Sequence, residues 1–345
     1  MLLFYLYNKT EPMKHITILV PDGQVNMGTI ATVVGAFEIF TEANSYWKRS
    51  GKELKYKIQT ASVSKKVEFS KGMITLQPEV TIASIKRTDL IIVPPSGIRS
   101  AGDIQKGNRS IVSWIEKQYK LGAEIASMCS GAFMLASSGI LNGKTCSTHW
   151  AHAETFRNSF PEVDLKEDKL ITVESGIYTN GGAYSFLNLV IYLVEKYYDR
   201  PTAIYCSKVF QVDLGRQAQS SFAIFSGQKK HSDDVILKAQ SYIEKNYQEK
   251  ISMELLSGQF SLGRRNFDRR FIKATGITPL DYLQRVKIEA AKTSLENTRK
   301  TVNEVMYDVG YNDTKAFREV FNRITGMSPV DYKSKYNRDH AVKGL

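Results

Sequence analysis

The chain is poor in cysteine, and it lacks any apolar run long enough to cross a membrane. Its three cysteines, Cys129, Cys146 and Cys206, are odd in number and far apart in a chain of 345 residues. They therefore do not indicate a disulfide framework and fit a reducing compartment better. The opening apolar stretch, Leu2–Tyr7, has no preceding positive charge and is too short for a signal-peptide core. We expect a cytoplasmic protein without a membrane partner.

Length and charge point to two domains and a polyanionic partner. A chain of 345 residues, 42% of them hydrophobic, is long enough to bury two separate cores. The net charge is +12, and residues 229–345 hold 22 Lys and Arg against 15 Asp and Glu, compared with 25 against 20 in residues 1–228. The denser positive charge of the carboxy-terminal third favours nucleic acid or an anionic membrane.

The first two thirds alternate between strand-like and helix-like patterns. A short β-branched run at Ile16–Pro21 is followed by Asp22-Gly23 and then by a helical pattern through residues 33–40. Such alternation predicts an α/β fold, flavodoxin-like, with a largely parallel sheet covered by helices on both faces. The other strands expected are Lys55–Ala61, Leu90–Val93, Glu124–Ser127 and Gly176–Asn180, with helices at Ser110–Lys120 and Ala183–Tyr197.

From about residue 200 onward no strand is expected, and the chain becomes helical and charged. A stretch rich in Ser, Gly and Lys near residues 217–230 predicts a linker. Met13 precedes the first strand and is a candidate for the natural start of the protein. The predicted organisation is an extension at 1–14, a front sensing domain at 15–215, a linker at 216–232, a helical domain at 233–336 and a tail at 337–345.

One segment of the helical third occurs twice at an offset of 50 residues. Asn266–Tyr282 and Ala316–Tyr332 share seven identities in 17 positions, including two Phe, a Thr-Gly pair, Pro, Asp and Tyr. Each copy predicts a short helix, a tight turn and a second helix that ends at the Gly, with Pro three residues later. The repeat therefore predicts two helix-turn-helix units.

The exposed faces of the two second helices carry side chains suited to DNA. Arg and Asn can bond guanine edges, adenine edges and phosphates in a major groove, which the second helix of this motif enters. A single exposed Arg or Lys is as often merely solvated, but here the basic residues recur on the same element of both copies. The candidate DNA-binding residues are Arg264, Arg265, Asn266 and Arg269 in the first unit, and Thr314, Lys315, Arg318 and Arg323 in the second.

Residues 233–336 resemble the DNA-binding domain of the AraC/XylS regulators. The stretches LSGQFSLGRRNFDRRFIKATGITPLDYLQRVKIEAAKTSLENT and VNEVMYDVGYNDTKAFREVFNRITGMSPVDY follow the two-part signature of that family. The resemblance implies two helix-turn-helix units joined by a long helix at about Pro279–Glu296, each unit sitting in the major groove of double-stranded DNA. Two positions depart from the family, Glu319 where Arg is frequent and Met306 where Ala is. The base-contacting positions implied by the family are Arg265, Asp268, Arg269, Thr314, Lys315 and Glu319.

In the front domain, an apolar strand runs into a small-residue turn that carries Cys129. A side chain at such a turn sits at the amino terminus of the next helix, where the helix dipole favours an anion and lowers the pKa of a thiol. We therefore consider a reactive thiol at Cys129, with a small buried cysteine as the alternative.

The stretch ASMCSGAFMLASSGILNGKTCSTHW resembles the nucleophile elbow of the ThiJ/PfpI superfamily, which has a class I glutamine-amidotransferase-like fold. Residues 15–215 resemble in particular the GlxA-like regulators, which join that fold to an AraC-type domain. The resemblance implies a catalytic His directly after the Cys and an acid from the first helix. Here Ser130 and Thr32 occupy those two positions. We therefore expect no catalytic set and no enzyme activity.

A sensing pocket is the more plausible role for this turn. Open α/β sheets bind ligands at the carboxyl ends of their strands. His149 and His152 have metal-ligand spacing, but no Cys or acid of suitable spacing accompanies them, so neither a metal nor another cofactor is expected. The residues predicted to line the ligand pocket are Ser96, Gly97, Cys129, Ser130 and His149.

These patterns together predict a sequence-specific transcription regulator whose front domain senses a small-molecule effector and forms a homodimer, with RNA polymerase as a further candidate partner. Two alternatives keep the cysteine active: an amidase or hydrolase tethered to nucleic acid, and a thiol redox sensor acting through Cys129. A third alternative is an architectural protein that coats DNA without sequence preference.

Overall fold

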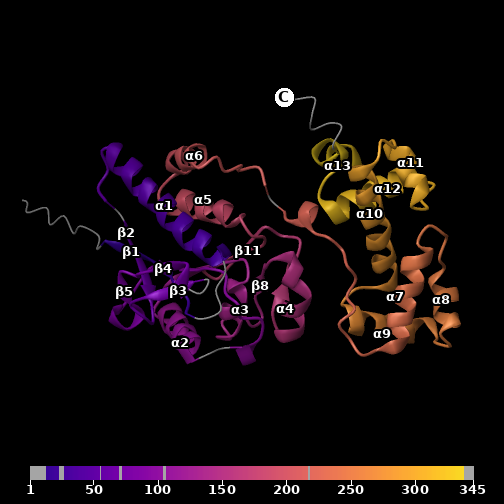
Figure 1. The fold of residues 1–345 in the computed structure, drawn as a ribbon, viewed down its shortest axis with the longest axis horizontal. Helices are drawn as coiled ribbons and strands as arrows, with labels where there is room; N and C mark the ends of the chain where they lie inside the picture. Colours follow the sequence, from indigo (N-terminus) through magenta and orange to yellow (C-terminus); the bar gives the residue numbers. More distant parts are fainter. Residues whose placement is uncertain are drawn as a thin grey trace, which may run out of the picture. The chain divides into compact units, whose positions relative to one another are not determined.

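The computed structural model describes residues 13–22, 27–54, 56–69, 72–103, 106–216 and 218–337. The chain forms two compact units, one up to Gln219 and the other from Ser220 onward (Figure 1). The possible start at Met13 concerns residues 1–12, which lie outside the described residues.

A seven-stranded sheet forms the centre of the front unit. Its strand order is β10-β11-β7-β6-β1-β2-β5, and every neighbouring pair is parallel except the antiparallel hairpin β10-β11 at one edge. The expected largely parallel sheet is thereby confirmed. The central strands are fully buried runs, because helices cover both of their faces. The strands span Lys14–Leu19 (β1), Tyr56–Ser62 (β2), Val80–Thr81 (β5), Leu90–Val93 (β6), Glu124–Met128 (β7), Ile171–Glu174 (β10) and Ile177–Asn180 (β11).

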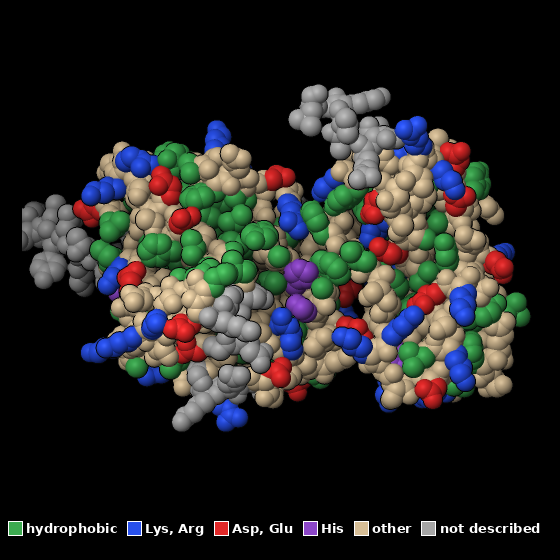
Figure 2. Space-filling model, viewed as in Figure 1, with side chains coloured by type: hydrophobic (Ala, Val, Ile, Leu, Met, Phe, Trp, Pro, Cys, Tyr) green, Lys and Arg blue, Asp and Glu red, His purple; other side chains and the backbone are tan. Residues whose placement is uncertain are grey.

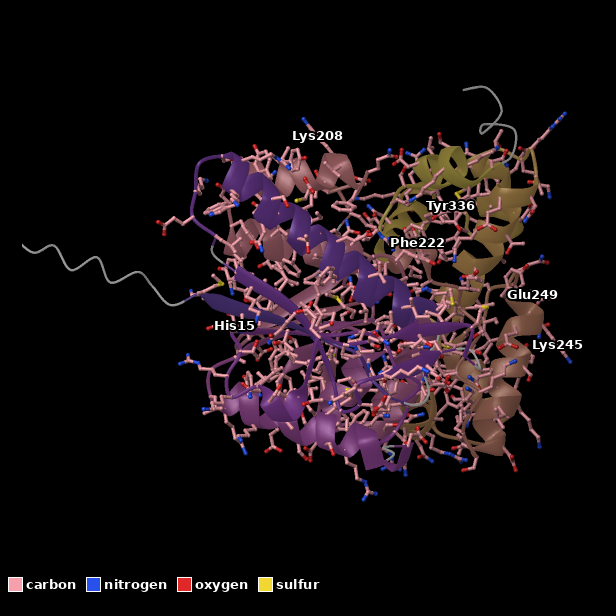
Figure 3. The ribbon with its side chains drawn as sticks, turned by 60° about the vertical axis from the view of Figure 1, so that its left-hand side comes forward. His15, Lys208, Phe222, Lys245, Glu249 and Tyr336 are labelled. Atoms are coloured by element: carbon pink, nitrogen blue, oxygen red, sulfur yellow. The ribbon has the colours of Figure 1, made fainter. Side chains whose placement is uncertain are left out.

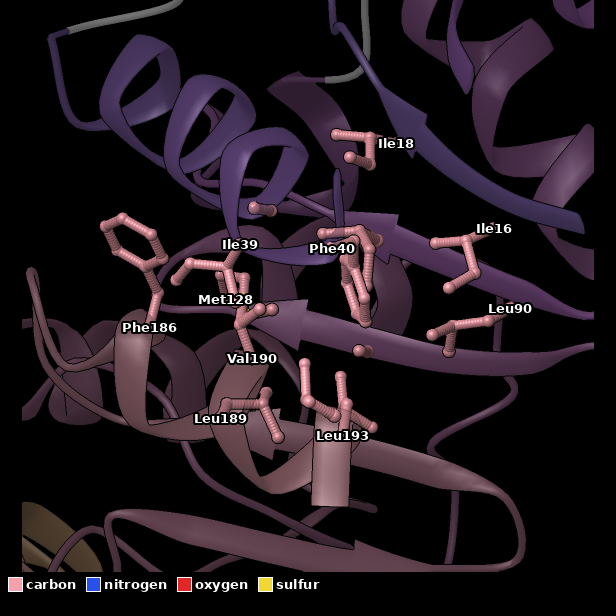
Figure 4. Packing of buried hydrophobic residues seen from close by; sticks show 14 of the residues in the cluster. Ile16, Ile18, Ile39, Phe40, Leu90, Met128, Phe186, Leu189, Val190 and Leu193 are labelled. Atoms are coloured by element: carbon pink, nitrogen blue, oxygen red, sulfur yellow. The ribbon is translucent and has the colours of Figure 1, made fainter. Parts of the chain in front are cut away.

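One face of the sheet is covered by α1 (Met27–Arg49), α5 (Phe186–Tyr197) and α6 (Arg200–Val209). Phe40 of α1 and Leu193 of α5 belong to one core cluster with the aliphatic side chains of the strands (Figure 4). The opposite face carries a second core with α2, α3 and α4 (Figure 1). Those three helices span Lys106–Lys120, Gly131–Ala136 and Ala153–Ser159.

Several short strands were not expected from the sequence. The hairpin of β3 (Val67–Phe69) and β4 (Ile74–Leu76) and the pair β8 (Thr145–Cys146) and β9 (Asp164–Leu165) have two or three residues each. Strands this short carry too few residues for an alternating pattern to be recognised.

The carboxy-terminal unit is built from seven α-helices and one short 3-10 helix, Ser220–Phe222, within its described part, residues 220–337 without a gap. The repeated segments adopt nearly identical structures, as the sequence predicted. In each, a Thr hydroxyl donates to the carbonyl four residues earlier, and the following Gly, Gly276 or Gly326, closes the helix at a φ of 78° or 77°. The helices span Asp234–Asn246 (α7), Met253–Gln259 (α8), Arg264–Thr275 (α9), Pro279–Asn297 (α10), Val302–Asp308 (α11), Thr314–Thr325 (α12) and Pro329–Tyr336 (α13).

Helix α10 joins two small cores. Tyr282 lies in the first with the two Phe of α9, and Ile288 lies in the second with the two Phe of α12. Tyr247, in the loop after α7, packs against both. The ammonium of Lys287, on α10, donates to the carbonyls of Val309 at 2.9 Å and Gly310 at 3.2 Å, so it satisfies the carboxyl end of α11.

The segment that precedes α7 packs against this unit. Phe222 makes an edge contact with Tyr336, with ring centroids 6.5 Å apart (Figure 3). The ammonium of Lys292 on α10 is almost fully buried and donates to the carbonyl of Ala223 at 2.6 Å and to Glu289 at 2.8 Å. Residues 220–225 are therefore held along α10 and α13 by buried polar contacts.

Gly310 is the position in this unit where a side chain should be least tolerated. It has a φ of 74°, and an added Cβ would lie 2.0 Å from the carbonyl oxygen of Gln248. We predict that Gly310→Ala destabilises the carboxy-terminal unit by about 2 kcal/mol or more. Gly258→Ala, in α8 with nothing within 4 Å, should be neutral or stabilising by about 0.5–1 kcal/mol.

The measurement is urea unfolding of the full chain, followed by far-ultraviolet circular dichroism. All three tryptophans, Trp47, Trp114 and Trp150, lie in the front unit, so their fluorescence reports that unit as an internal control. Equal midpoints for the two variants would show that the Gly310 turn can relax around a methyl group.

Candidate functional site

The exposed side of α9 presents three of the predicted DNA-binding residues. Phe267 and Phe271 are fully buried on its inner side, so Arg265, Asn266 and Arg269 face outward and are exposed. Arg269 donates to the Asn266 side-chain oxygen at 3.0 Å, a short surface contact that a base edge can replace. These three side chains form the part of α9 best prepared to contact DNA.

Arg264 and Asp268, also predicted to contact DNA, are paired with each other. The Arg264 Nε donates to both carboxylate oxygens of Asp268, at 2.9 and 2.8 Å, and its Nη1 donates to Glu254 of α8 at 2.6 Å. Such partly exposed pairs contribute about 0–1 kcal/mol, so a stronger partner can displace them. In the structure, however, Arg264 ties α9 to α8.

On α12 the exposed candidates are more mixed in charge. Lys315, Arg318 and Glu319 are exposed and Thr314 is half-buried. The ammonium of Lys315 lies 4.0 Å from the carboxylate of Glu319, and both side chains are largely in solvent. Glu319 is an exposed carboxylate, whereas Asp268 of α9 is half-buried and paired with Arg264, so the exposed face of α12 should attract phosphates less than that of α9. Figure 2 shows acidic side chains between basic ones on the drawn face of the carboxy-terminal unit as a whole.

Arg323 has an intramolecular partner that the sequence did not reveal. Its guanidinium donates to Asp281 at 2.9 Å and to Gln284 at 2.7 Å, both on α10. Burial acts to raise the pKa of Asp281, but the hydrogen bonds and charges of Arg285 and Arg323 lower it overall. Arg323 therefore links α12, in the second helix-turn-helix unit, to α10, the helix that joins the two helix-turn-helix units.

Cys129 occupies a strained turn at the carboxyl end of β7. Its φ is 53°, and its backbone N–H donates to the carbonyl of Asn180 on β11 at 2.9 Å. The turn approaches β6 so closely that a Cβ on Gly131 would lie 2.6 Å from the carbonyl oxygen of Val93. Small residues are needed here because two strand ends meet, which explains the sequence of the elbow.

The thiol of Cys129 is more protected than the sequence suggested. The residue is 7% exposed. Burial raises the pKa of the Cys129 thiol, and this outweighs the backbone N–H of Ser130 and the charge of Arg99, which act to lower it. The expectation of a lowered pKa is therefore wrong. Desolvation of the thiolate raises the pKa of Cys129 by more than the amino terminus of the six-residue helix α3 lowers it.

The predicted pocket residues come from loops at the carboxyl ends of neighbouring strands. The Ser130 hydroxyl donates to the carbonyl of Ser96 at 3.0 Å, and Gly97 follows in the same loop after β6. His149 accepts a hydrogen bond from the backbone of Ala151 at its Nδ1, at 3.1 Å. Burial lowers the pKa of His149, and the charge of Arg99 acts in the same direction.

Arg99 and His152 also belong to this cluster, although the sequence patterns indicated no role for Arg99 and only metal-ligand spacing for His152. Arg99 donates to the carbonyls of Ser96 and Ile98 at 2.6 and 2.8 Å, and its Nη2 lies 3.4 Å from Nε2 of His152. Arg99 lies three residues after Ser96, in the loop that follows a buried strand. That position could have marked it in the sequence as a ligand-binding residue.

The described contacts do not form a hydrolytic set around the thiol. No hydrogen bond joins Cys129 to His149 among them, and Ser130 stands where a base would be needed. Thr32 is fully buried on α1, with no hydrogen-bond partner for its hydroxyl in the described structure. Among the described residues, no group of three or more His, Cys, Asp and Glu has the arrangement of a metal site. No helix in the described ranges is long and apolar enough to span a membrane.

We predict that alkylation of Cys129 accelerates with pH beyond the range of an ordinary thiol. Because its pKa is raised above the usual 9.0, the thiolate fraction of native Cys129 should keep increasing at pH values where that of an ordinary thiol has levelled off. The rate with iodoacetamide, measured by peptide mass spectrometry, should therefore still be rising in the native protein after it has levelled off in the unfolded chain. The same cysteine in the urea-unfolded chain is the control. A plateau in the native protein below about pH 8.5 would contradict the burial argument.

Two family models match the chain. Residues 17–195 match the DJ-1/PfpI family, and residues 256–335 match a helix-turn-helix domain. The chain is similar to the HTH-type transcriptional regulator GbdR of Pseudomonas aeruginosa, with 23% identity over 309 residues, which cover 88% of this chain and 80% of the relative. It is also similar to the HTH-type transcriptional regulator GlxA of Rhizobium meliloti, with 24% identity over 61% of this chain and 65% of the relative.

A solved structure supports the fold of the front unit. A crystal structure of a protein from Vibrio parahaemolyticus superimposes with a TM-score of 0.50 at 20% sequence identity, covering 57% of this chain and 98% of that one. The resemblances found in the elbow and in the repeated helices are thereby confirmed. The chain belongs to the DJ-1/PfpI family and carries a helix-turn-helix domain in its carboxy-terminal part.

Proposed function

We propose that this protein is a sequence-specific DNA-binding transcription regulator whose front domain binds a small-molecule effector. The observation that carries the proposal is the duplicated helix-turn-helix structure, in which each second helix buries two Phe and turns polar side chains outward. Relatives named as HTH-type transcriptional regulators, similar over most of the chain, support it.

The first helix-turn-helix unit, which contains α9, is proposed to contribute most of the base contacts. On α9, Arg265, Asn266 and Arg269 are exposed, and the guanidinium and amide groups match guanine and adenine edges in the major groove. On α12, Lys315 and Arg318 are exposed beside Glu319, whose negative charge opposes contact with DNA, so this helix is proposed to contribute fewer base contacts than α9.

The fixed link between the two helix-turn-helix units favours sequence-specific binding of DNA over binding that ignores its sequence. Lys287 and Tyr247 connect the two cores through buried contacts, and Arg323 adds a bond from α12 to α10. Because α9 and α12 are both held on α10, they can enter the major groove together only at DNA sites whose two contacted segments have one fixed spacing. An architectural protein does not need this arrangement.

For the front domain we propose a sensing role without catalysis. The protected thiol, the Ser in place of a catalytic His and the buried Thr32 all argue against a cysteine amidase or hydrolase. The raised pKa of Cys129 also argues against a thiol redox sensor, because oxidants react with the thiolate. The pocket residues Ser96, Gly97, Cys129, Ser130 and His149, with Arg99 and His152, are the proposed effector site.

We further propose that the protein is cytoplasmic, acts as a homodimer and contacts RNA polymerase at its promoters. Pairing places two DNA-binding units on one target, which raises affinity through linked binding. The expected result of sedimentation equilibrium is a species of twice the 39.0 kDa of one chain. A monomer at concentrations that saturate a specific DNA site would refute the dimer.

The DNA-binding proposal is tested by Arg265→Ala and Arg269→Ala. Each should cost about 1–3 kcal/mol of binding free energy on a duplex selected from random sequences, and much less on scrambled DNA, because base contacts are lost. The control is Lys208→Ala on α6 of the front unit, which removes the same charge from an exposed position (Figure 3). Titrations followed by fluorescence anisotropy give the affinities. Equal losses on selected and scrambled DNA would refute base reading by these residues.

A further inference from the structure

Arg99 is a half-buried cation whose charge is not balanced by a carboxylate in the described structure. Its guanidinium is held by the carbonyls of Ser96 and Ile98 and lies over the ring of Phe133, 5.5 Å from the centroid. No ion pair between Arg99 and an Asp or Glu occurs among the described residues. Arg99 is fixed by neutral partners, so its charge remains available to a ligand.

Apart from Asp103, the groups around Arg99 add no negative charge under neutral conditions. Cys129 is a protected thiol, and His149 and His152 are imidazoles whose ring centroids lie 5.7 Å apart. Asp103 is an acid whose charge acts on Arg99. It is exposed, and its carboxylate accepts the backbone N–H of Arg99 at 3.0 Å instead of pairing with the guanidinium. The internal stretches outside the described residues, 23–26, 55, 70–71, 104–105 and 217, contain no Asp or Glu in the sequence.

Two orphan hydroxyls on the neighbouring segments form a second, independent observation. Ser96 is 1% exposed and Thr32 is 0% exposed, and neither hydroxyl has a hydrogen-bond partner in the described structure. The segments that carry them are joined, because the Thr29 hydroxyl of α1 donates to the carbonyl of Pro95 at 2.8 Å. Buried hydroxyls are nearly always satisfied, so a partner from outside the chain is expected here.

We propose that this cluster is the binding site for a small carboxylate, with Arg99 as its anchor. The proposal rests on the sensing role proposed above and names the chemical class of the effector. The planar guanidinium matches the two oxygens of one carboxylate, and one buried charge balances one anionic group. His149 and His152 in this cluster are partly exposed to solvent, and Cys129 is buried.

The test compares two alkylating reagents of nearly equal size at Cys129. The thiolate sulfur displaces iodide from iodoacetate, which carries a carboxylate, or from iodoacetamide, which is neutral. Arg99 should attract the first reagent, so the ratio of the iodoacetate rate to the iodoacetamide rate should fall by at least about fivefold in Arg99→Gln. Peptide mapping isolates Cys129, because Cys146 and Cys206 are fully buried and burial raises the pKa of each to about 12.

The matched control is Arg200→Gln on α6, which removes an exposed cation paired with Glu195. It should leave the rate ratio at the wild-type value. A second measurement does not depend on the fold of a variant. Sodium propionate should slow the labelling of wild-type Cys129 by iodoacetamide, whereas propionamide should not.

Three outcomes would overturn the proposal: equal rate ratios in wild type and Arg99→Gln, equal effects of propionate and propionamide, or no labelling of Cys129 by either reagent. The assay contains no DNA. A negative result in the alkylation assay would therefore not affect the evidence for base contacts from the DNA titrations. A loss of sequence preference in those titrations would in turn not affect the evidence for the carboxylate site.

Discussion

The ammonium of Lys287 is the contact on which the carboxy-terminal unit depends. It is buried on α10 and donates to the two carbonyls that close α11, so a rotation of the second helix-turn-helix unit about the shared helix would break these hydrogen bonds and leave buried polar groups unsatisfied. Burial lowers the pKa of Lys287, which is the electrostatic cost of this arrangement. Tyr247 in both cores and Arg323 on Asp281 reinforce the same connection from either side.

The front unit follows a different constraint, the close approach of two strand ends. Gly131 passes against the carbonyls of Val93 and Pro94, which places the loop after β6 beside the turn after β7. That contact brings Arg99 from one loop and Cys129 from the other into electrostatic contact. The thiol remains protected, and within the described ranges the guanidinium has no ion pair with a carboxylate, a combination that suits binding more than covalent chemistry.

Much of this architecture could be predicted because it is encoded locally. The Phe pairs of α9 and α12, the Gly that ends each helix and the buried runs of β6 and β7 are periodic signals within short windows. The partners of Arg264, Arg323 and Arg99 could not be predicted in this way. Each depends on tertiary contacts between segments, and only the fold shows which exposed Arg is already engaged. The pKa of Cys129 was misjudged for the same reason, since local sequence indicates a helix terminus but not the depth of burial.

The two copies of the repeat follow one another in the same chain direction, and their outward faces differ. Arg265 and Arg269 of the first copy correspond to Lys315 and Glu319 of the second. A single chain therefore has an inherent polarity, and its target sequence read backwards is a different target. Promoter recognition by such a chain fixes not only where it sits but also which way it points along the genome.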